Sequence, residues 1–150
     1  THAGLHASHL TEEIRNMSGT RQLTAIGEYL DKSIIDGLRD AANNKPSWVL
    51  NAGYSRGGSQ RYGGIVWNDH NREHCPIIGL NQLYGHSPQQ NPNWLIQDTL
   101  KSKPYFNVAD KYVNVEFDIN KSYNLCLDTH LHHYAIWDGK KLSIHWIGDI

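Results

Sequence analysis

The sequence carries almost no excess charge and has no long apolar run. Its 150 residues have a formal net charge of −1, and 19% of them are charged. A near-neutral chain lacks the positive field that holds polyanions, so we expect no nucleic acid among its partners. Its apolar runs are much shorter than the roughly 18 residues of a membrane-spanning helix, so we expect no membrane association either.

Cysteine is also scarce. Cys75 and Cys126 are the two in the sequence, and they would pair in an oxidising compartment but stay reduced in the cytosol. The first residues, from Thr1, show neither the basic nor the apolar region of a signal peptide. We expect a protein that is secreted or delivered to the periplasm or cell wall, with the cytoplasm as the alternative.

The first 45 residues predict two helices. Thr11 is an N-cap candidate, because acidic residues follow it in the first turn, and this helix should end by Ser18. A longer helix should begin near Thr20 and end before Pro46, since the residue before a proline is pushed out of the α region. Its apolar residues recur at helical spacing. They are Leu23, Ile26, Leu30, Ile34 and Leu38.

The middle of the chain predicts short elements around a loop. A strand is expected at residues 47–50. Residues 53–64 contain five glycines and should form a permissive loop. Short helices are expected at 76–84 and 94–100, the first of them opened by a proline.

The last third of the chain alternates apolar and polar residues, which predicts an antiparallel meander. Its strands are expected at 112–117, 123–127, 131–137 and 142–147. Helices first and strands last indicate one α+β domain over residues 1–150. Within it we expect a helical part at 1–45, the glycine-rich loop and a nucleophile helix at 53–85, and the antiparallel sheet at 105–150.

Cys75 directly precedes Pro76 and therefore falls at the predicted N-cap of a helix. The helix dipole would lower the pKa of a thiol at this place, and the free backbone N–H groups could hold an oxyanion. These features indicate a cysteine nucleophile. The alternatives are a buried structural cysteine and a disulfide with Cys126.

Two histidines on the last predicted hairpin supply the other parts of such a site. His133 and His145 lie twelve residues apart around a turn. With a three-residue connection at 138–140, they fall opposite each other, with Cβ atoms roughly 5 Å apart. His133 could then take the proton of Cys75 while His145 holds it in one tautomer, as in a catalytic triad. A two-residue turn would slip the register by one and remove the pairing.

Metal binding is the other use of these histidines. The ligands available to a zinc ion near the hairpin would be His130, His132, His133, His145 and Asp128. Neighbouring residues of a strand point to opposite faces, and the spacing matches no standard zinc pattern. We therefore favour the cysteine site and expect no metal and no cofactor.

The order Tyr62, Gly63, Gly64, then Cys75, then His133 fifty-eight residues later and His145 after another twelve resembles a known family. NlpC-type cysteine peptidases, which cut bacterial cell-wall peptides, carry a Tyr-x-Gly-Gly-like loop, a cysteine opening a helix, a histidine on a strand and a third polar residue. The segment from His133 to His145 is similar to the family's His-Val-Gly-Ile-Tyr…Ile-His hairpin.

The resemblance implies a papain-like, NlpC-like fold, with N-terminal helices packed on a C-terminal antiparallel β-meander. It implies a cysteine hydrolase that cleaves an amide bond in peptidoglycan peptides or in a protein. Cys75 would be the nucleophile, His133 the base and His145 the orienter. Such a protein would act as a cell-wall endopeptidase or as an interbacterial amidase toxin, and a toxin would have an immunity protein as its partner.

Three residues are expected to contact the substrate. Tyr62 matches the family tyrosine that binds substrate and the tetrahedral intermediate. His74 lies beside the cysteine, and Trp137 lies in the hairpin. Deamidating effectors and acyltransferases use the same constellation, so the acceptor of the acyl group stays open.

Two other functions remain open at this point. A histidine-based ribonuclease toxin would use two of the ten histidines as acid and base and would not need the thiol. A carbohydrate-binding module would stack tryptophans on sugar rings. Its candidates are Trp48, Trp67, Trp94, Trp137 and Trp146.

Overall fold

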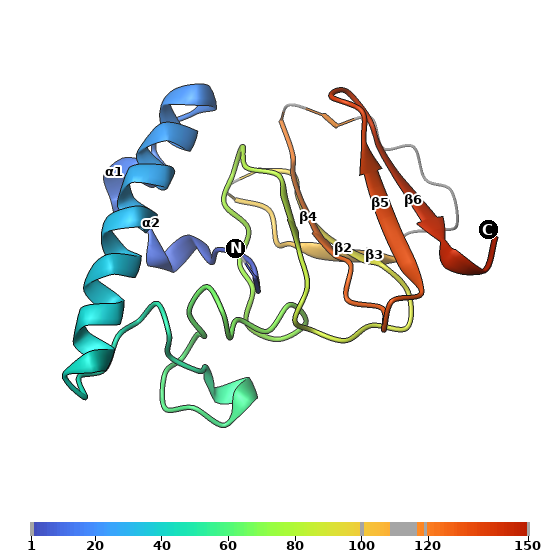
Figure 1. Cartoon of the computed structure of the whole chain (residues 1–150). Helices are drawn as coiled ribbons and strands as arrows, with labels where there is room; N and C mark the ends of the chain where they lie inside the picture. Colours follow the sequence, from blue (N-terminus) through green and yellow to red (C-terminus); the bar gives the residue numbers. More distant parts are fainter. Residues whose placement is uncertain (1, 100, 109–116, 119, 150) are drawn as a thin grey trace.

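The computed structural model describes residues 2–99, 101–108, 117–118 and 120–149. Within them two α-helices precede six strands, and short 3-10 turns lie before the first helix, between the second helix and the first strand, and after the last strand (Figure 1). The strands form one four-stranded sheet and a separate two-stranded hairpin. The α+β class is therefore confirmed, while these elements do not single out a papain-like fold.

Both N-terminal helices form where the sequence predicts them. Helix α1 spans Glu12–Arg15, and the Thr11 hydroxyl caps it by accepting the N–H of Ile14 at 3.3 Å. Helix α2 spans Gly19–Ala42 and ends ahead of Pro46. The stop agrees with the backbone restriction that a proline imposes on the residue before it.

Only part of the apolar stripe of α2 is covered. Ile26 is buried and Leu30 is partly buried, whereas Leu23 and Leu38 are exposed. The covered part joins the loops and the N-terminal segment in a first hydrophobic cluster. Its buried members are Leu5, Leu10, Ile14, Ile26, Val49, Ile65 and Ile77.

The larger sheet has the strand order β1-β4-β2-β3. These strands are β1 Gln82–Tyr84, β2 Asn93–Gln97, β3 Tyr105–Val108 and β4 Ser122–Cys126. β4 runs parallel to β1 and antiparallel to β2, and β2 runs antiparallel to β3. Strand β4 is buried along its whole length, as expected for an internal strand covered on both faces.

The hairpin of β5 His133–Trp137 and β6 Leu142–Trp146 packs against this sheet. In Figure 1 it lies beyond the sheet as seen from α2. The contact forms a second hydrophobic cluster between the two sheets. Its buried members are Trp94, Ile96, Tyr123, Leu125, Leu142 and Ile144.

The predicted meander is wrong for the described strands. Strand β4 pairs with β1 and β2 and not with β5, so the chain leaves one sheet before it forms the hairpin. The strand predicted at 112–117 falls almost entirely on residues 109–116, which lie outside the described residues. The hairpin itself is confirmed.

The helix predicted at 76–84 is also wrong. Gly79 has a φ of 79°, and its N–H donates to Oγ of Ser122 at 2.9 Å. The same hydroxyl donates to the carbonyl of Ile77 at 2.9 Å. Backbone groups that a helix would pair internally are therefore bonded to β4, and the segment continues into β1.

Two further short elements differ from expectation. Of the residues predicted as a helix at 94–100, those at 94–97 belong to β2, and all four are buried between neighbouring strands, while residue 100 lies outside the described residues. A continuous apolar run of this length fits a buried strand as well as a helix. Residues 47–50, predicted as a strand, form a turn in which the N–H of Leu50 donates to the carbonyl of Ser47 at 3.2 Å.

The N-terminal segment lies between α2 and the four-stranded sheet (Figure 1). Leu5 donates to the side-chain oxygen of Gln82 at 2.8 Å and accepts from its side-chain nitrogen at 3.0 Å. The N–H of Ala7 donates to the carbonyl of Cys75 at 3.0 Å. These bonds fix residues 6–9 over the loops that follow α2. No described helix is both long and apolar enough to cross a bilayer.

Candidate active site

The register of the hairpin separates the two histidines predicted to act together. His133 pairs with Trp146, and His145 pairs with Tyr134. Paired residues share a face of a hairpin and successive residues alternate. His133 and His145 therefore lie on opposite faces, and the predicted pairing is wrong.

The hydrophobic core and the turn explain this register. Four residues, 138–141, connect the strands, and the carboxylate of Asp138 accepts two N–H groups of the turn, at 2.8 and 2.7 Å. This arrangement turns Leu142 and Ile144 into the core between the sheets. A slip of one residue would send both apolar side chains to the other face, which the core does not allow.

Each histidine of the hairpin has contacts of its own. Nδ1 of His133 lies 3.0 Å from Oγ1 of Thr129. Nε2 of His145 lies 2.9 Å from Oγ of Ser143, and its ring stacks on Tyr134 with centroids 5.1 Å apart. These contacts hold the two rings in separate surroundings.

Cys75 lacks the surroundings predicted for a nucleophile. No helix begins at this residue, and its thiol lies 3.9 Å from the carbonyl of Pro76. Burial raises the pKa of the thiol, and the nearby charge of Arg15 only partly opposes this. Cys75 and Cys126 are both free, so the disulfide alternative is wrong.

The three predicted substrate contacts fall in different places. Trp137 lines a pocket between the two sheets. His74 is buried and both ring nitrogens are bonded inside the protein, Nδ1 to Asn68 at 2.7 Å and Nε2 to Asn124 at 3.1 Å. His74 is therefore a structural residue, which corrects the prediction. Tyr62 lines another pocket, beside the N-terminal segment.

This second pocket, which we call the histidine pocket, has a volume of about 160 Å³. It opens between the N-terminal segment, the turn after α2 and the glycine-rich loop. Its walls carry a hydroxyl, an imidazole, two amides and a guanidinium. The lining residues are Ser8, His9, Trp48, Asn51, Gln60, Arg61 and Tyr62.

Ser8, which lines the pocket, makes a close polar contact with the buried His6 beside it. Nδ1 of His6 accepts the backbone N–H of Ser8 at 3.0 Å and lies 2.7 Å from the Ser8 hydroxyl. Because a backbone N–H can only donate, Nδ1 carries no proton and the neutral ring carries it on Nε2. The Ser8 hydroxyl is therefore positioned to donate to a basic nitrogen.

Aromatic contacts fix the imidazoles. The ring of His6 stacks on Tyr62 with centroids 4.0 Å apart, and the guanidinium of Arg61 lies 5.1 Å from the centre of the Tyr62 ring. The ring of His9 lies 4.7 Å from Trp48, whose other neighbour is Tyr29. The pocket walls are thus held by ring packing more than by flexible side chains.

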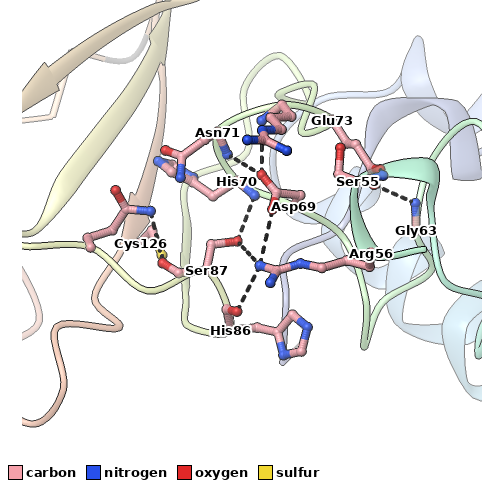
Figure 2. A network of polar contacts seen from close by, with 12 residues as sticks. Ser55, Arg56, Gly63, Asp69, His70, Asn71, Glu73, His86, Ser87 and Cys126 are labelled. Carbon is pink, nitrogen blue, oxygen red and sulfur yellow. Dashed lines mark hydrogen bonds and ion pairs between the residues drawn. The ribbon is translucent and has the colours of Figure 1, made fainter. Parts of the chain in front are cut away.

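A buried carboxylate holds the glycine-rich loop over the pocket (Figure 2). Oε1 of Glu73 accepts the N–H of Ser55 at 2.7 Å, and Oε2 accepts the N–H of Gly63 at 2.9 Å. A Cβ at Gly53 would collide with this carboxylate, which explains why the first residue of the loop is a glycine. The two bonds place Arg61 and Tyr62 at the pocket.

The same loop is tied to the sheet on its other side (Figure 2). Arg56 forms an ion pair with Asp69 at 3.1 Å and donates to the hydroxyl of Ser87 at 3.1 Å. That hydroxyl also accepts the N–H of His70 at 2.8 Å. The carbonyl of Ser87 lies 3.2 Å from the thiol of Cys126.

The histidines of this region are neutral at physiological pH. Burial, with His9, His74 and Arg61 nearby, lowers the pKa of His6 to about 3, against a small opposing effect from the carbonyl of Glu73. Burial alone lowers the pKa of His9 to about 4. Nε2 of His6 and Nδ1 of His9 are buried and make no hydrogen bond of good geometry to the described residues.

The pocket is electrostatically suited to an anion. Arg61 is positively charged, the imidazoles can gain protons, and no carboxylate lines the pocket in the described part of the chain. A bound anion would raise the pKa of both histidines by offsetting the neighbouring positive charges. Its oxygens could also accept hydrogen bonds from Asn51 and Gln60.

The structure does not assemble a metal site from the described residues, because no three of their His, Cys, Asp or Glu side chains come together. The zinc ligands considered near the hairpin are thus not grouped around one point. This observation concerns only the ranges that the structure describes.

The residues of the histidine pocket were missed by sequence reasoning. The sequence signal for this pocket was the run His6-Ala-Ser8-His9 just before the N-cap Thr11. The spacing of these residues matches no known type of active site. Arg61 lies next to Tyr62, which was selected for another reason. No family model matches the sequence, and neither the curated proteins nor the solved structures include a match to this chain.

Proposed function

We propose that the chain is a hydrolase of small phosphodiesters, with Ser8 as nucleophile and His6 as its base. The observation that carries this proposal is the 2.7 Å contact between the Ser8 hydroxyl and Nδ1 of His6 beside a pocket that also contains Arg61. A hydroxyl, an imidazole acceptor and an anion-binding group are the parts that nucleophilic catalysis on a phosphate ester needs.

Charge favours a diester over other esters. A phosphodiester carries one negative charge, shared by the non-bridging oxygens around the phosphorus that is attacked, and Arg61 supplies one positive charge. A carboxylic ester or an amide is neutral and would leave the guanidinium without a counter-charge in the ground state. The net charge of −1 for the chain argues against long nucleic acids, so the substrate is a small molecule.

The reaction proceeds in two balanced steps. Oγ of Ser8 bonds to phosphorus, its proton passes to Nδ1 of His6, and the P–O bond to the leaving alcohol breaks. His6 returns the proton to the alcohol oxygen. Water then attacks phosphorus, the bond to Ser8 breaks, and one proton of the water returns to Oγ through His6. The products are one phosphomonoester and one alcohol.

His9 and Arg61 have supporting parts in this scheme. His9 lines the pocket in its neutral form and can accept a hydrogen bond from the attacking water. Arg61 binds the non-bridging phosphate oxygens and stabilises the charge that builds up on them.

Bis(p-nitrophenyl) phosphate, p-nitrophenyl phosphate and p-nitrophenyl acetate distinguish the ester classes by release of p-nitrophenol. We expect turnover of the diester, slower turnover of the dianionic monoester and little of the acetate. Purified peptidoglycan tests the amide substrate expected from the NlpC-type resemblance. Release of peptide fragments without any hydrolysis of the diester would overturn the proposal.

The cysteine hydrolase stays a prediction, and it now lacks geometric support. It required His133 and His145 on one face and Cys75 at a helix start, and neither feature is present. The phosphodiesterase and the cysteine hydrolase predict opposite effects of one substitution on activity. Cys75→Ala leaves a serine-dependent phosphodiesterase active and destroys a cysteine hydrolase.

A further inference from the structure

The largest of the pockets described above lies between the four-stranded sheet and the hairpin, on strands that take no part in the histidine pocket. It has a volume of about 420 Å³, within the range typical of small-molecule sites. Side chains from β1, β2, β4, β5 and β6 line it, together with Asn81 and Phe117. We call it the aromatic pocket, after Trp94, Phe117, Tyr123 and Trp137.

The pocket is the unfilled end of the core between the two sheets. Trp94, Tyr123 and Leu142 belong to that core and are buried. At the mouth, Trp137 is 54% exposed and Leu83 is 50% exposed. Apolar side chains that line an open space lack contact on one side and leave apolar surface in water. A molecule that fills the space would supply the missing packing contacts and remove the apolar surface from water.

The rings are arranged to receive another aromatic ring. Phe117 lies at the centre, with its centroid 5.2 Å from Tyr123, 5.9 Å from Trp137 and 6.3 Å from Trp94. The Tyr123 and Trp94 contacts are edge-to-face, and the Trp137 contact is tilted. Such packing presents ring edges and faces that a further aromatic ring can meet in its preferred geometries.

The polar groups of the pocket limit the ligand further. Among the described residues, its lining contains no charged side chain. The amide of Gln82 is already bonded to Leu5 and Asn124, and Oδ1 of Asn81 accepts the N–H of Tyr123 at 2.9 Å. What remains on the described lining is the amide N–H of Asn81, the Tyr123 hydroxyl and the indole N–H groups of Trp94 and Trp137.

This chemistry selects among ligand classes. A charged ligand would lose its hydration without gaining a counter-charge. A sugar would bring more hydroxyl groups than these few donors can satisfy, and each unsatisfied buried hydroxyl weakens binding. We infer that the aromatic pocket binds a neutral aromatic molecule with one hydrogen-bond acceptor, which Asn81 recognises. This inference does not depend on the proposed phosphodiesterase activity.

Prodan, a neutral naphthyl ketone whose fluorescence reports the polarity around it, serves as the probe. Titration into the full chain should give a saturable blue shift with one molecule bound per chain. Cellotriose and the charged dye anilinonaphthalene sulfonate should not displace it. Displacement by either compound at a concentration comparable with that of prodan, or the absence of saturable binding, overturns the inference.

Two variants locate the binding. Trp137→Ala removes the exposed ring at the mouth and should weaken prodan binding by about tenfold or more. Trp146→Ala is the matched control, because Trp146 lies on the same hairpin but does not line the pocket. Asn81→Ala should weaken prodan more than naphthalene, which has no acceptor. Equal affinities for wild type and Trp137→Ala, with both proteins folded by circular dichroism, would place the probe elsewhere and overturn the inference.

Discussion

The Ser8 hydroxyl lies 2.7 Å from Nδ1 of His6, on the acceptor side of a neutral imidazole. The backbone N–H of Ser8 donates to the same nitrogen and fixes the tautomer. The base is therefore unprotonated before substrate arrives, because burial, with His9, His74 and Arg61 nearby, lowers its pKa to about 3.

The first prediction concerns the pH dependence of catalysis. The acid limb of kcat/KM reports the base of the free enzyme. Because the pKa of His6 is lowered to about 3, kcat/KM for bis(p-nitrophenyl) phosphate should stay level between pH 8 and about 5. An ordinary histidine base would give a fall below about pH 6.5. A fall at that pH, in protein shown to be folded, contradicts the assignment of His6.

The second prediction concerns Arg61. Arg61→Ala removes a charge-assisted contact with the phosphate, which is worth about 1.5–3 kcal/mol, so KM should rise by roughly tenfold or more. Arg21→Ala, on the exposed face of α2, is the matched control and should leave KM unchanged. Steady-state kinetics with the diester measure both. Equal KM values for the two variants would show that Arg61 does not bind the phosphate.

The third prediction concerns the clamp on the glycine-rich loop. Glu73→Gln replaces one carboxylate oxygen by an amide that cannot accept the N–H of Ser55 or Gly63. Leaving a buried donor unsatisfied costs about 1–3 kcal/mol, and we expect that loss in urea unfolding together with faster proteolysis within residues 53–64. Glu28→Gln, exposed on α2, is the control. Unchanged stability and unchanged cleavage would mean that the clamp does not hold the loop.

The fourth prediction concerns stability and acid. Burial lowers the pKa of His6 and His74 to about 3 and that of His9 and His70 to about 4. In the unfolded chain these groups take up protons below about pH 6.5, so protons favour the unfolded state. Their contribution to stability is complete above that pH and is lost as the pH falls toward 4.

Urea unfolding at pH 7.5, 6 and 5 measures this loss. Each buried histidine contributes a slope of up to about 1.4 kcal/mol per pH unit once the unfolded form is protonated. A free energy of unfolding that is constant from pH 7.5 to pH 5 would contradict the burial of neutral histidines.

Local sequence rules predicted the elements that depend on local chemistry. The Thr11 cap, the length of α2 and the existence of the last hairpin follow from capping, periodicity and turn residues. These local rules failed where a contact with a distant part of the chain supplies the hydrogen bonds of the backbone. The side chain of Ser122 bonds to two backbone groups of the segment after Cys75, so that segment does not form the helix that Pro76 indicates.

The geometry of the candidate site depends even more strongly on contacts between residues that are far apart in the sequence. The register that separates His133 from His145 follows from the burial of Leu142 and Ile144 against a sheet that alternation alone did not define. The pocket around Ser8 lies between the N-terminal segment and a loop about fifty residues away, and the buried carboxylate of Glu73 binds that loop. Of its lining, only Tyr62 and Trp48 were selected from the sequence, each for another function.

The most direct test of the account compares Ser8→Ala with Cys75→Ala on bis(p-nitrophenyl) phosphate. Ser8 is exposed, so the alanine variant should fold, and thermal unfolding verifies this. We predict that Ser8→Ala lowers kcat by about a hundredfold or more, while Cys75→Ala retains the wild-type rate. Full activity in Ser8→Ala, or loss of activity in Cys75→Ala alone, would contradict the account.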